Sequence, residues 1–217
     1  MTDGSTKSRT PANKGKRYHA EPLTDVEVKA LLAQCSRRAP TGIRNRALIT
    51  VLYRCGLRIS EALNLYLKDY DAQAGTIRIL NGKGGKSRTV AIDPGAADTL
   101  QLWINKRATF GLNGRQPIFC TITDSRDGKL KAGSPLKTAY IRTLMKRIGE
   151  KAGIAKRVHA HGLRHSFAVS EVQRGVPVAI LRLELGHGSL STTSVYVDGL
   201  NPQAAIDSMR NREWSPD

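Results

Sequence analysis

Hydrophobic residues recur at helical spacing through the first third of the chain. Thr24 and Glu27 have the spacing of a capping box, and the helix that they open is expected to end near Arg38. A second apolar run predicts a helix over residues 42–55, which stops at Gly56 because glycine readily adopts the left-handed conformation that ends a helix. The folded part of the chain is therefore expected to begin as a helical protein.

The periodicity changes in the following segment. A third helix is expected to start at Ser60, whose hydroxyl suits an N-cap, ahead of the apolar Ala62 and Leu63. From Thr76 on, TIRIL alternates as a strand does, NGKGG supplies a turn, and KSRTVAI alternates again. This pattern predicts a β-hairpin over residues 76–92.

Helical spacing returns in the second half of the chain. Ser134 as an N-cap, Pro135 at the first helical position and Gly153 just beyond the end predict a helix over residues 135–152. Further helices are predicted over residues 95–109, 161–174, 177–185 and 202–210. The fold class that follows is mainly α with a small antiparallel β-sheet, an α+β arrangement.

The 217 residues are enough for one domain with a substantial core. Residues 1–20 are polar and basic and offer almost nothing to bury, so we expect a disordered basic arm there. Residues 21–217 are then expected to form a single domain.

Basic residues greatly outnumber acidic ones, with 35 Lys and Arg against 18 Asp and Glu, which gives a formal charge of +17 at pH 7. A compact fold must carry much of this charge on its surface, where it attracts polyanions. Double-stranded DNA is the favoured partner, because each neutralised phosphate releases counterions. A membrane-binding chain would instead show an amphipathic helix rich in Trp, Phe and Leu, which this sequence lacks.

The cysteines and the first residues bear on the location of the protein. Cys35, Cys55 and Cys120 are odd in number and contain no close pair, which argues against a disulfide framework and against a zinc site. No apolar run approaches the roughly 20 residues of a membrane span. The first residues also lack the apolar core of a signal peptide. We therefore expect a cytoplasmic, DNA-associated protein without a metal.

Two stretches in the last third of the chain carry residues suited to phosphate chemistry. In HAHGLRHSF, His161 and Arg164 stand three apart and share a helical face, which would place a proton-transfer group beside a guanidinium fork. A solvated helix face explains this segment about equally well. In LGHGSLSTTSVYVDG, His187 follows a glycine and Tyr196 comes nine residues later, although a lone tyrosine is more often half-buried packing.

Together with YRCGLRISEALNL near the front of the chain, these stretches resemble the tyrosine recombinase, or phage integrase, family over roughly residues 22–210. The family's first catalytic arginine lies in a Gly-Leu-Arg-Ile-Ser-Glu stretch, which places it at Arg58. Its catalytic lysine lies in a Gly-Lys-Gly turn at a hairpin tip, which places it at Lys83, with Lys86 as a neighbour that could be mistaken for it. The catalytic set that the resemblance implies is Arg58, Lys83, His161, Arg164, His187 and Tyr196.

The resemblance implies a role for each member of this set. Arg58 and Arg164, aided by His187, would stabilise the charge that grows on the non-bridging phosphate oxygens. Tyr196 would attack phosphorus while His161 takes or relays its proton.

The remaining roles complete the implied reaction. Lys83 would protonate the departing 5′ oxygen, and Glu61, one helical turn beyond Arg58, is expected to orient the cationic side chains. The product would be a 3′-phosphotyrosyl link that stores the bond energy, so no ATP, metal or other cofactor is implied.

The family also implies partners. Its members act as tetramers on two DNA sites and pass a C-terminal segment to a neighbouring subunit; residues 201–217 could do so, or fold back on their own domain. Only about 20 residues precede the catalytic pattern, so the N-terminal core-binding domain of the family is expected to be absent. This departure leaves room for an accessory DNA-binding or recombinase partner.

Two other functions remain open. A type IB topoisomerase uses the same residue types to relax supercoils, and a non-catalytic DNA-binding regulator would need only the basic surface. The LGHxxLSTT run before Tyr196 looks more like the recombinases, and a regulator would not require Tyr196. A Walker phosphate loop does not fit GKGGKS, because Leu80 stands where its first glycine is needed. The direction of the reaction, whether integration, excision, inversion or dimer resolution, is left open.

Overall fold

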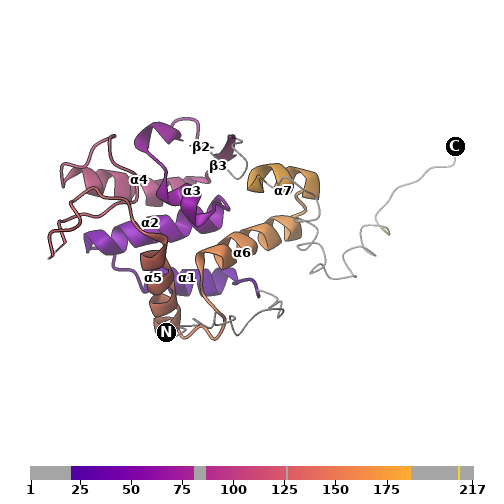
Figure 1. Cartoon of the computed structure of the whole chain (residues 1–217). Coiled ribbons are helices and arrows are strands. Elements are labelled where there is room, and N and C mark those ends of the chain that lie inside the picture. The colour runs from indigo at the N-terminus through magenta and orange to yellow at the C-terminus, as the bar shows by residue number, and fades with distance from the viewer. Residues whose placement is uncertain (1–20, 81–86, 126, 187–209, 211–217) are drawn as a thin grey trace, which may run out of the picture.

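The computed structural model describes residues 21–80, 87–125, 127–186 and 210. This part of the chain is built mainly from helices with one small antiparallel sheet, which confirms the predicted α+β class (Figure 1). Its elements are α1 (Asp25–Ala33), α2 (Pro40–Arg54), α3 (Ile59–Leu63), the 3-10 helix η1 (Leu67–Asp69), β1 (Tyr70–Asp71), β2 (Thr76–Ile79), β3 (Arg88–Ala91), α4 (Pro94–Ala108), α5 (Thr138–Lys151), α6 (Ala160–Gln173) and α7 (Val178–Leu185).

Helix α2 runs through the centre of the domain and packs against both α4 and α6 (Figure 1). Its apolar run includes Leu48, Val51 and Leu52, each at most 1% exposed. Burial of one such side chain stabilises a fold by roughly 1.5–3 kcal/mol relative to exposure. Because α2 is enclosed in the main core, the core also fixes the position of the residues that follow it, Gly56 and Arg58.

The sheet has the order β1-β2-β3, and both pairs of neighbouring strands are antiparallel. Ile77 pairs with Val90 and both are buried, whereas their neighbours Arg78 and Thr89 are exposed. This alternation confirms the two predicted hairpin strands, while the turn at 81–86 lies outside the described residues. Strand β1 is not predicted from the sequence, since two residues are too few to show an alternating pattern.

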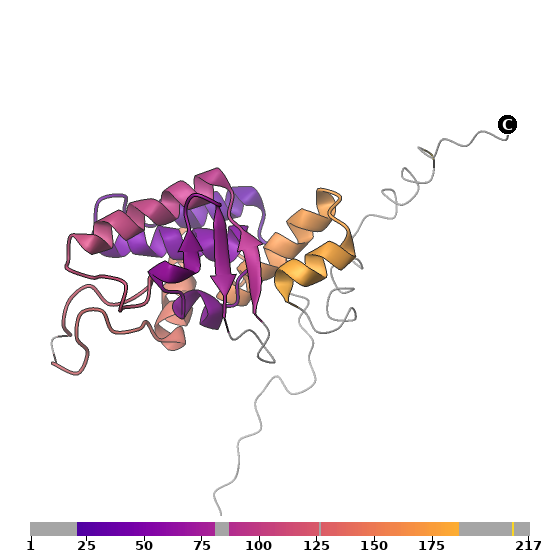
Figure 2. The ribbon, with the colours of Figure 1, turned by 90° about the horizontal axis from the view of Figure 1, so that it is seen from above.

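Helix α7 packs on a small hydrophobic cluster of its own, apart from the main core. The buried members of this second cluster are Phe167, Ala168, Val172, Leu181 and Leu185. Helix α7 lies beside β3 at one side of the sheet (Figure 2). The end of α7 is thereby brought next to the first residue of β3.

The structure corrects the boundary between the first two helices. Helix α1 ends at Ala33 rather than near Arg38. The Ser36 hydroxyl accepts hydrogen bonds from the backbone N–H groups of Arg38 and Ala39, at 3.1 and 3.0 Å, and so forms a turn. Proline suits the first turn of a helix and disfavours a helical residue before it, so α2 begins at Pro40, two residues earlier than expected.

Helix α3 begins at Ile59, one residue earlier than its predicted N-cap. Ser60 therefore lies inside the first turn and does not cap the helix. The capping hydrogen bond comes from the Glu61 side chain instead, since its Oε2 accepts the backbone N–H of Arg58 at 2.8 Å. The N-cap residue is thus Arg58 itself.

The predicted start of α5 is also wrong, because this helix begins at Thr138 rather than Pro135. Pro135 forms an isolated antiparallel bridge with Cys120, and the Ser134 carbonyl accepts the N–H of Thr121 at 2.9 Å. This pairing draws the segment toward the chain at 120–121, so Ser134 does not act as a cap.

The remaining elements agree closely with the sequence. The helices predicted over 95–109, 161–174 and 177–185 are confirmed as α4, α6 and α7, within one residue at each end. The three cysteines are free and buried. Among the described residues, no helix has the length and apolar character needed to cross a membrane. The predicted arm over 1–20 and, apart from Arg210, the predicted helix over 202–210 lie outside the described residues.

Candidate active site

Three arginines from different elements meet at the carboxylate of Glu61. Arg58 immediately precedes α3, Arg88 is the first residue of β3, and Arg164 lies in the first half of α6. Glu61 Oε1 accepts hydrogen bonds from Nη1 of Arg58 at 2.7 Å and from Nη1 of Arg88 at 2.9 Å. Glu61 Oε2 accepts a hydrogen bond from Nη2 of Arg88 at 2.8 Å and lies 3.9 Å from Nη1 of Arg164. We call these three arginines with Glu61 the arginine cluster.

Three consecutive carbonyl groups at the end of α7 hold the same arginines. The bonds run from Arg88 Nε to Glu184 O at 2.8 Å, from Arg164 Nη2 to Leu185 O at 2.6 Å and from Arg58 Nη2 to Gly186 O at 3.3 Å. The last carbonyls of a helix lack partners within the helix and carry a partial negative charge. Guanidinium groups placed there donate the missing hydrogen bonds and balance the partial negative charge. The end of α7 and Glu61 together therefore hold the three arginine side chains in position.

Gly56 makes the approach of α6 to the end of α2 possible. Its φ of 58° lies in the left-handed region that glycine adopts without steric cost. Its carbonyl oxygen accepts a hydrogen bond from Nη1 of Arg164 at 2.6 Å. A Cβ atom at this position would lie only 2.4 Å from Cδ1 of Phe167. Glycine is therefore needed here both for the turn and for the packing of α6.

Glu61 is anionic in this environment. Its side chain is only 4% exposed, and burial alone would raise the pKa of its carboxyl group. The hydrogen bonds from Arg88 and Arg58 outweigh that effect and lower the pKa from 4.5 to about 2. Glu61 thus remains a charged acceptor for the arginines throughout the physiological pH range.

His161 lies in the first turn of α6, three residues before Arg164, as its spacing predicts. Although the residue is exposed at the surface, partial desolvation lowers the pKa of its imidazole below 6.5, and the positive charges of Arg164 and Arg58 lower it further. The ring is therefore mainly neutral at pH 7, the form that can accept a proton.

Arg88 belongs to the cluster but is not among the residues predicted from the sequence. In KSRTVAI it shares a strand face with Val90 and Ile92, both of which are buried. An arginine on the inward face of a strand must find acceptors inside the protein, because a buried charge without partners is costly. This position in the alternating pattern is the signal that points to Arg88.

Three of the predicted site residues, Lys83, His187 and Tyr196, lie outside the described residues, so their places in the site stay predictions. Among the predicted residues that the structure describes, Arg58, Glu61 and Arg164 are in the cluster. His161 is close enough to two of these arginines to be affected by their charge.

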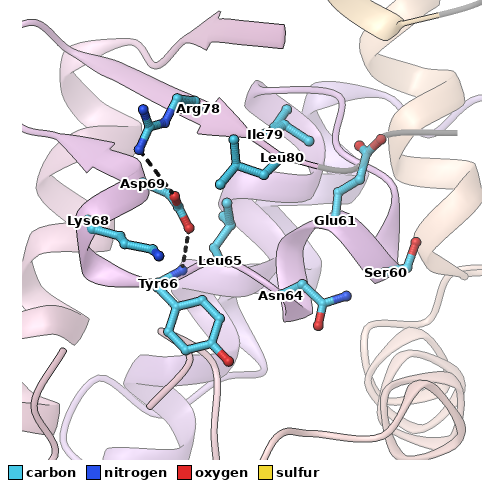
Figure 3. A pocket seen from close by; sticks show the side chains of 10 residues that line it. All are labelled: Ser60, Glu61, Asn64, Leu65, Tyr66, Lys68, Asp69, Arg78, Ile79 and Leu80. Atoms are coloured by element: carbon cyan, nitrogen blue, oxygen red, sulfur yellow. Dashed lines mark hydrogen bonds and ion pairs between the residues drawn. The ribbon is translucent and has the colours of Figure 1, made fainter. Parts of the chain in front are cut away.

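A cavity of about 420 Å³ borders Glu61, between α3, η1 and the end of β2 (Figure 3). Asp69 lies on its wall, where Oδ2 accepts the backbone N–H of Tyr66 at 3.0 Å and Oδ1 lies 4.0 Å from Nη2 of Arg78. None of the three arginines of the cluster lines this cavity. The candidate site is therefore defined by the arginine cluster and not by the cavity.

The sequence profile of the phage integrase family matches residues 21–201. The chain belongs to the phage integrase family. Tyrosine recombinase XerA of Thermococcus kodakarensis is 37% identical over 174 residues, which cover 80% of this chain and 56% of that relative. Tyrosine recombinase XerD of Ralstonia nicotianae is 32% identical over 174 residues, covering 80% and 54%. The chain thus spans about half the length of these two phage integrase family members.

Solved structures agree with this family assignment. The crystal structure of XerA recombinase matches with a TM-score of 0.72 at 27% identity, covering 96% of this chain and 71% of that one. The XerH site-specific recombinase bound to palindromic difH substrate, in a post-cleavage complex, matches with a TM-score of 0.69 at 30% identity, covering 87% and 52%. The chain has the fold of the catalytic domain of tyrosine recombinases, as the resemblance implies.

Proposed function

We propose that this chain is the catalytic part of a site-specific DNA recombinase that cleaves and rejoins double-stranded DNA through a 3′-phosphotyrosyl intermediate. The arginine cluster carries the proposal, because Glu61 holds Arg58 and Arg164 side by side in a chain of the phage integrase family. The related XerH, bound to its substrate in a post-cleavage complex, supports DNA as the partner. The charge of +17 favours binding to the phosphate backbone.

Arg58 and Arg164 would stabilise the transition state at the scissile phosphate. Arg58 is 24% exposed, and its bonds to Glu61 and Gly186 leave further N–H donors for the non-bridging oxygens. Arg164 is 1% exposed, so we infer that DNA binding displaces neighbouring groups before its fork contacts the phosphate. Each of these donors would lower the barrier by roughly 3 kcal/mol, the scale of one oxyanion-hole donor, and His187 would add a further hydrogen bond.

Proton transfers balance the cleavage step. The hydroxyl oxygen of Tyr196 forms a bond to phosphorus, and the phenolic proton passes to His161, whose imidazole is neutral at pH 7 because its pKa is lowered. The bond from phosphorus to the 5′ oxygen breaks, and Lys83 gives that oxygen a proton. The phosphotyrosine conserves the bond energy, so rejoining by the reverse steps requires neither ATP nor a metal.

The active assembly is proposed to be a tetramer on two DNA sites in the cytoplasm, with an accessory DNA-binding or recombinase partner where the chain alone does not hold DNA tightly. Residues 21–217 form the catalytic domain in this proposal, and residues 1–20 add a basic arm that contacts the DNA backbone.

The proposal can be tested with a nicked suicide DNA substrate. This substrate contains the candidate recombination site that lies beside the gene encoding this protein. After incubation, we expect a covalent protein–DNA adduct that withstands denaturation and is absent with Tyr196→Phe. Retention of the adduct in Tyr196→Phe would exclude Tyr196 as the nucleophile. DNA binding without any adduct would favour a non-catalytic regulator instead.

Product topology separates the recombinase from a type IB topoisomerase. A recombinase should join new partners and require the specific site. Relaxation of supercoiled plasmids that lack the site, without exchanged products, would favour the topoisomerase.

A further inference from the structure

Arg88 uses three nitrogen atoms to join three elements. From β3 it donates through Nη1 and Nη2 to the two oxygens of Glu61 on α3, at 2.9 and 2.8 Å. Its Nε donates to the carbonyl oxygen of Glu184 on α7, at 2.8 Å. Its side chain is 11% exposed, which gives it little surface for contact with DNA.

Arg88 limits how Arg58 can bind Glu61. Arg58 makes one side-chain hydrogen bond to the carboxylate, at Oε1, and its other terminal nitrogen is directed to Gly186. Paired guanidinium and carboxylate groups prefer two parallel hydrogen bonds. Here Arg88 makes the two parallel hydrogen bonds to Glu61. Arg58 is therefore bound to the same carboxylate by a single side-chain hydrogen bond.

Loss of Arg88 would leave the buried Glu61 carboxylate, 4% exposed, with two of its three arginine partners, and without the one that binds both of its oxygens. A buried charge that loses a partner attracts another one strongly. Arg58 is the nearest candidate, since it already lies 2.7 Å from Oε1. Arg58 would turn toward Glu61 and withdraw N–H donors from the position where a phosphate would bind.

The backbone around Gly186 is shaped for this arrangement. Gly186 caps α7 with a φ of 61°, and a Cβ atom there would lie 3.1 Å from Cδ and Nη1 of Arg88. The carbonyl oxygen of Gly186 accepts a hydrogen bond from Nη2 of Arg58 at 3.3 Å. One residue at the end of α7 therefore makes room for Arg88 and also accepts Arg58.

We propose that Arg88 is a positioning residue, which occupies both oxygens of Glu61 and so keeps the donors of Arg58 available to the DNA phosphate. The inference rests on the proposed recombinase function. It assigns to Arg88 an effect that passes through Arg58 and not through direct contact with DNA.

Single-turnover cleavage of the suicide substrate by excess protein tests this assignment. Arg88→Gln should lower the cleavage rate roughly ten- to a hundredfold, the usual cost of losing a group that orients a reactive one. Arg88→Lys keeps the charge but loses the planar fork, so its cleavage rate should lie between the rates of the wild type and of Arg88→Gln. Arg174→Gln is the matched control, because it breaks an ion pair with Glu171 at the end of α6, where the Arg174 side chain is 61% exposed, and its rate should stay unchanged.

A double-mutant cycle separates positioning from a general structural effect. If Arg88 acts through Arg58, adding Arg88→Gln to Arg58→Ala should cost less than about threefold, since coupled residues are not additive. Circular dichroism melting checks that the variants are folded. The same rate loss with and without Arg58, or no loss in Arg88→Gln, would overturn the assignment.

A second measurement does not depend on cleavage. In DNA-free Tyr196→Phe protein, the Nε–H of Arg58 is followed by NMR, with and without Arg88→Gln. We expect its resonance to shift and its hydrogen exchange to change as Arg58 turns toward Glu61; an unchanged resonance would refute the role of Arg88. If the wild-type protein forms no adduct while this resonance shifts, the recombinase proposal fails and the effect of Arg88 on Arg58 stands.

Discussion

Arg164 Nη1 donates to the carbonyl oxygen of Gly56 at 2.6 Å, across 108 positions of sequence. The bond joins the first half of α6 to Gly56, which lies two residues beyond the end of α2 and two residues before Arg58. The two arginines of the proposed catalytic set are therefore placed relative to one another through a glycine that has no chemistry of its own.

Replacement of this glycine should be unusually costly. In Gly56→Ala the new Cβ would meet both a left-handed φ and the ring of Phe167 at 2.4 Å. We expect a loss of about 2–4 kcal/mol in the free energy of unfolding, measured by urea denaturation. Gly153→Ala is the control, since Gly153 also follows a helix C-cap, at φ 67°, with nothing within 4 Å of the added Cβ. It should cost only about 1 kcal/mol, and equal losses would contradict the steric explanation.

Arg58→Lys tests whether charge alone suffices at this position. A lysine ammonium cannot bind Glu61 and Gly186 while presenting a planar fork to a phosphate. Cleavage of the suicide substrate should therefore slow by roughly a hundred- to a thousandfold. Arg174→Lys, at an exposed ion pair, should cleave at the wild-type rate. A fully active Arg58→Lys enzyme would mean that the fork geometry is not needed.

The low pKa of Glu61 predicts a pH-dependent stability. Its folded-state pKa is about 2, against 4.5 for an ordinary glutamate, so the unfolded chain binds the proton more readily. The stabilisation is complete above pH 4.5 and is lost as the pH falls toward 2. The contribution of ionised Glu61 to the free energy of unfolding is on the order of 3 kcal/mol. Urea denaturation across this range should show a flatter pH dependence for Glu61→Gln than for the wild type; parallel curves would contradict the pKa.

The pKa of His161 should lie below 6.5, because desolvation and the charges of Arg164 and Arg58 disfavour its protonation. NMR titration of the imidazole Cε1–H measures this pKa directly. In Arg58→Gln one of the positive charges is removed, so the pKa of His161 should rise. An equal or lower value in the variant would show that Arg58 does not act on the ring.

The helices and the hairpin could be predicted because each leaves a local pattern. Helix α2 carries closely spaced apolar residues from Ala47 to Leu52, and β2 and β3 alternate around buried Ile77 and Val90. The start of α5 could not be predicted this way. It depends on pairing between Pro135 and Cys120, 15 positions apart in the sequence, which overrides a local capping signal at Ser134.

The candidate site divides in the same manner. Arg58 and Glu61 are three residues apart, so the resemblance and helical spacing together predict their contact. The contacts of Arg88 cannot be predicted in this way, because its partners Glu61 and Glu184 are 27 and 96 positions away. The carbonyl groups at the end of α7 have no side-chain signature at all, so only the fold reveals that they receive the arginines.

The small second cluster beneath α7 has a consequence for heat tolerance. Its five buried residues join α7 to the second half of α6, whereas the main core holds the other elements of the described domain together. Regions with few buried apolar contacts open at a lower free-energy cost than the whole molecule. Since all three guanidinium groups of the cluster rest on the last carbonyls of α7, mild warming should inactivate the protein while most of its helices persist.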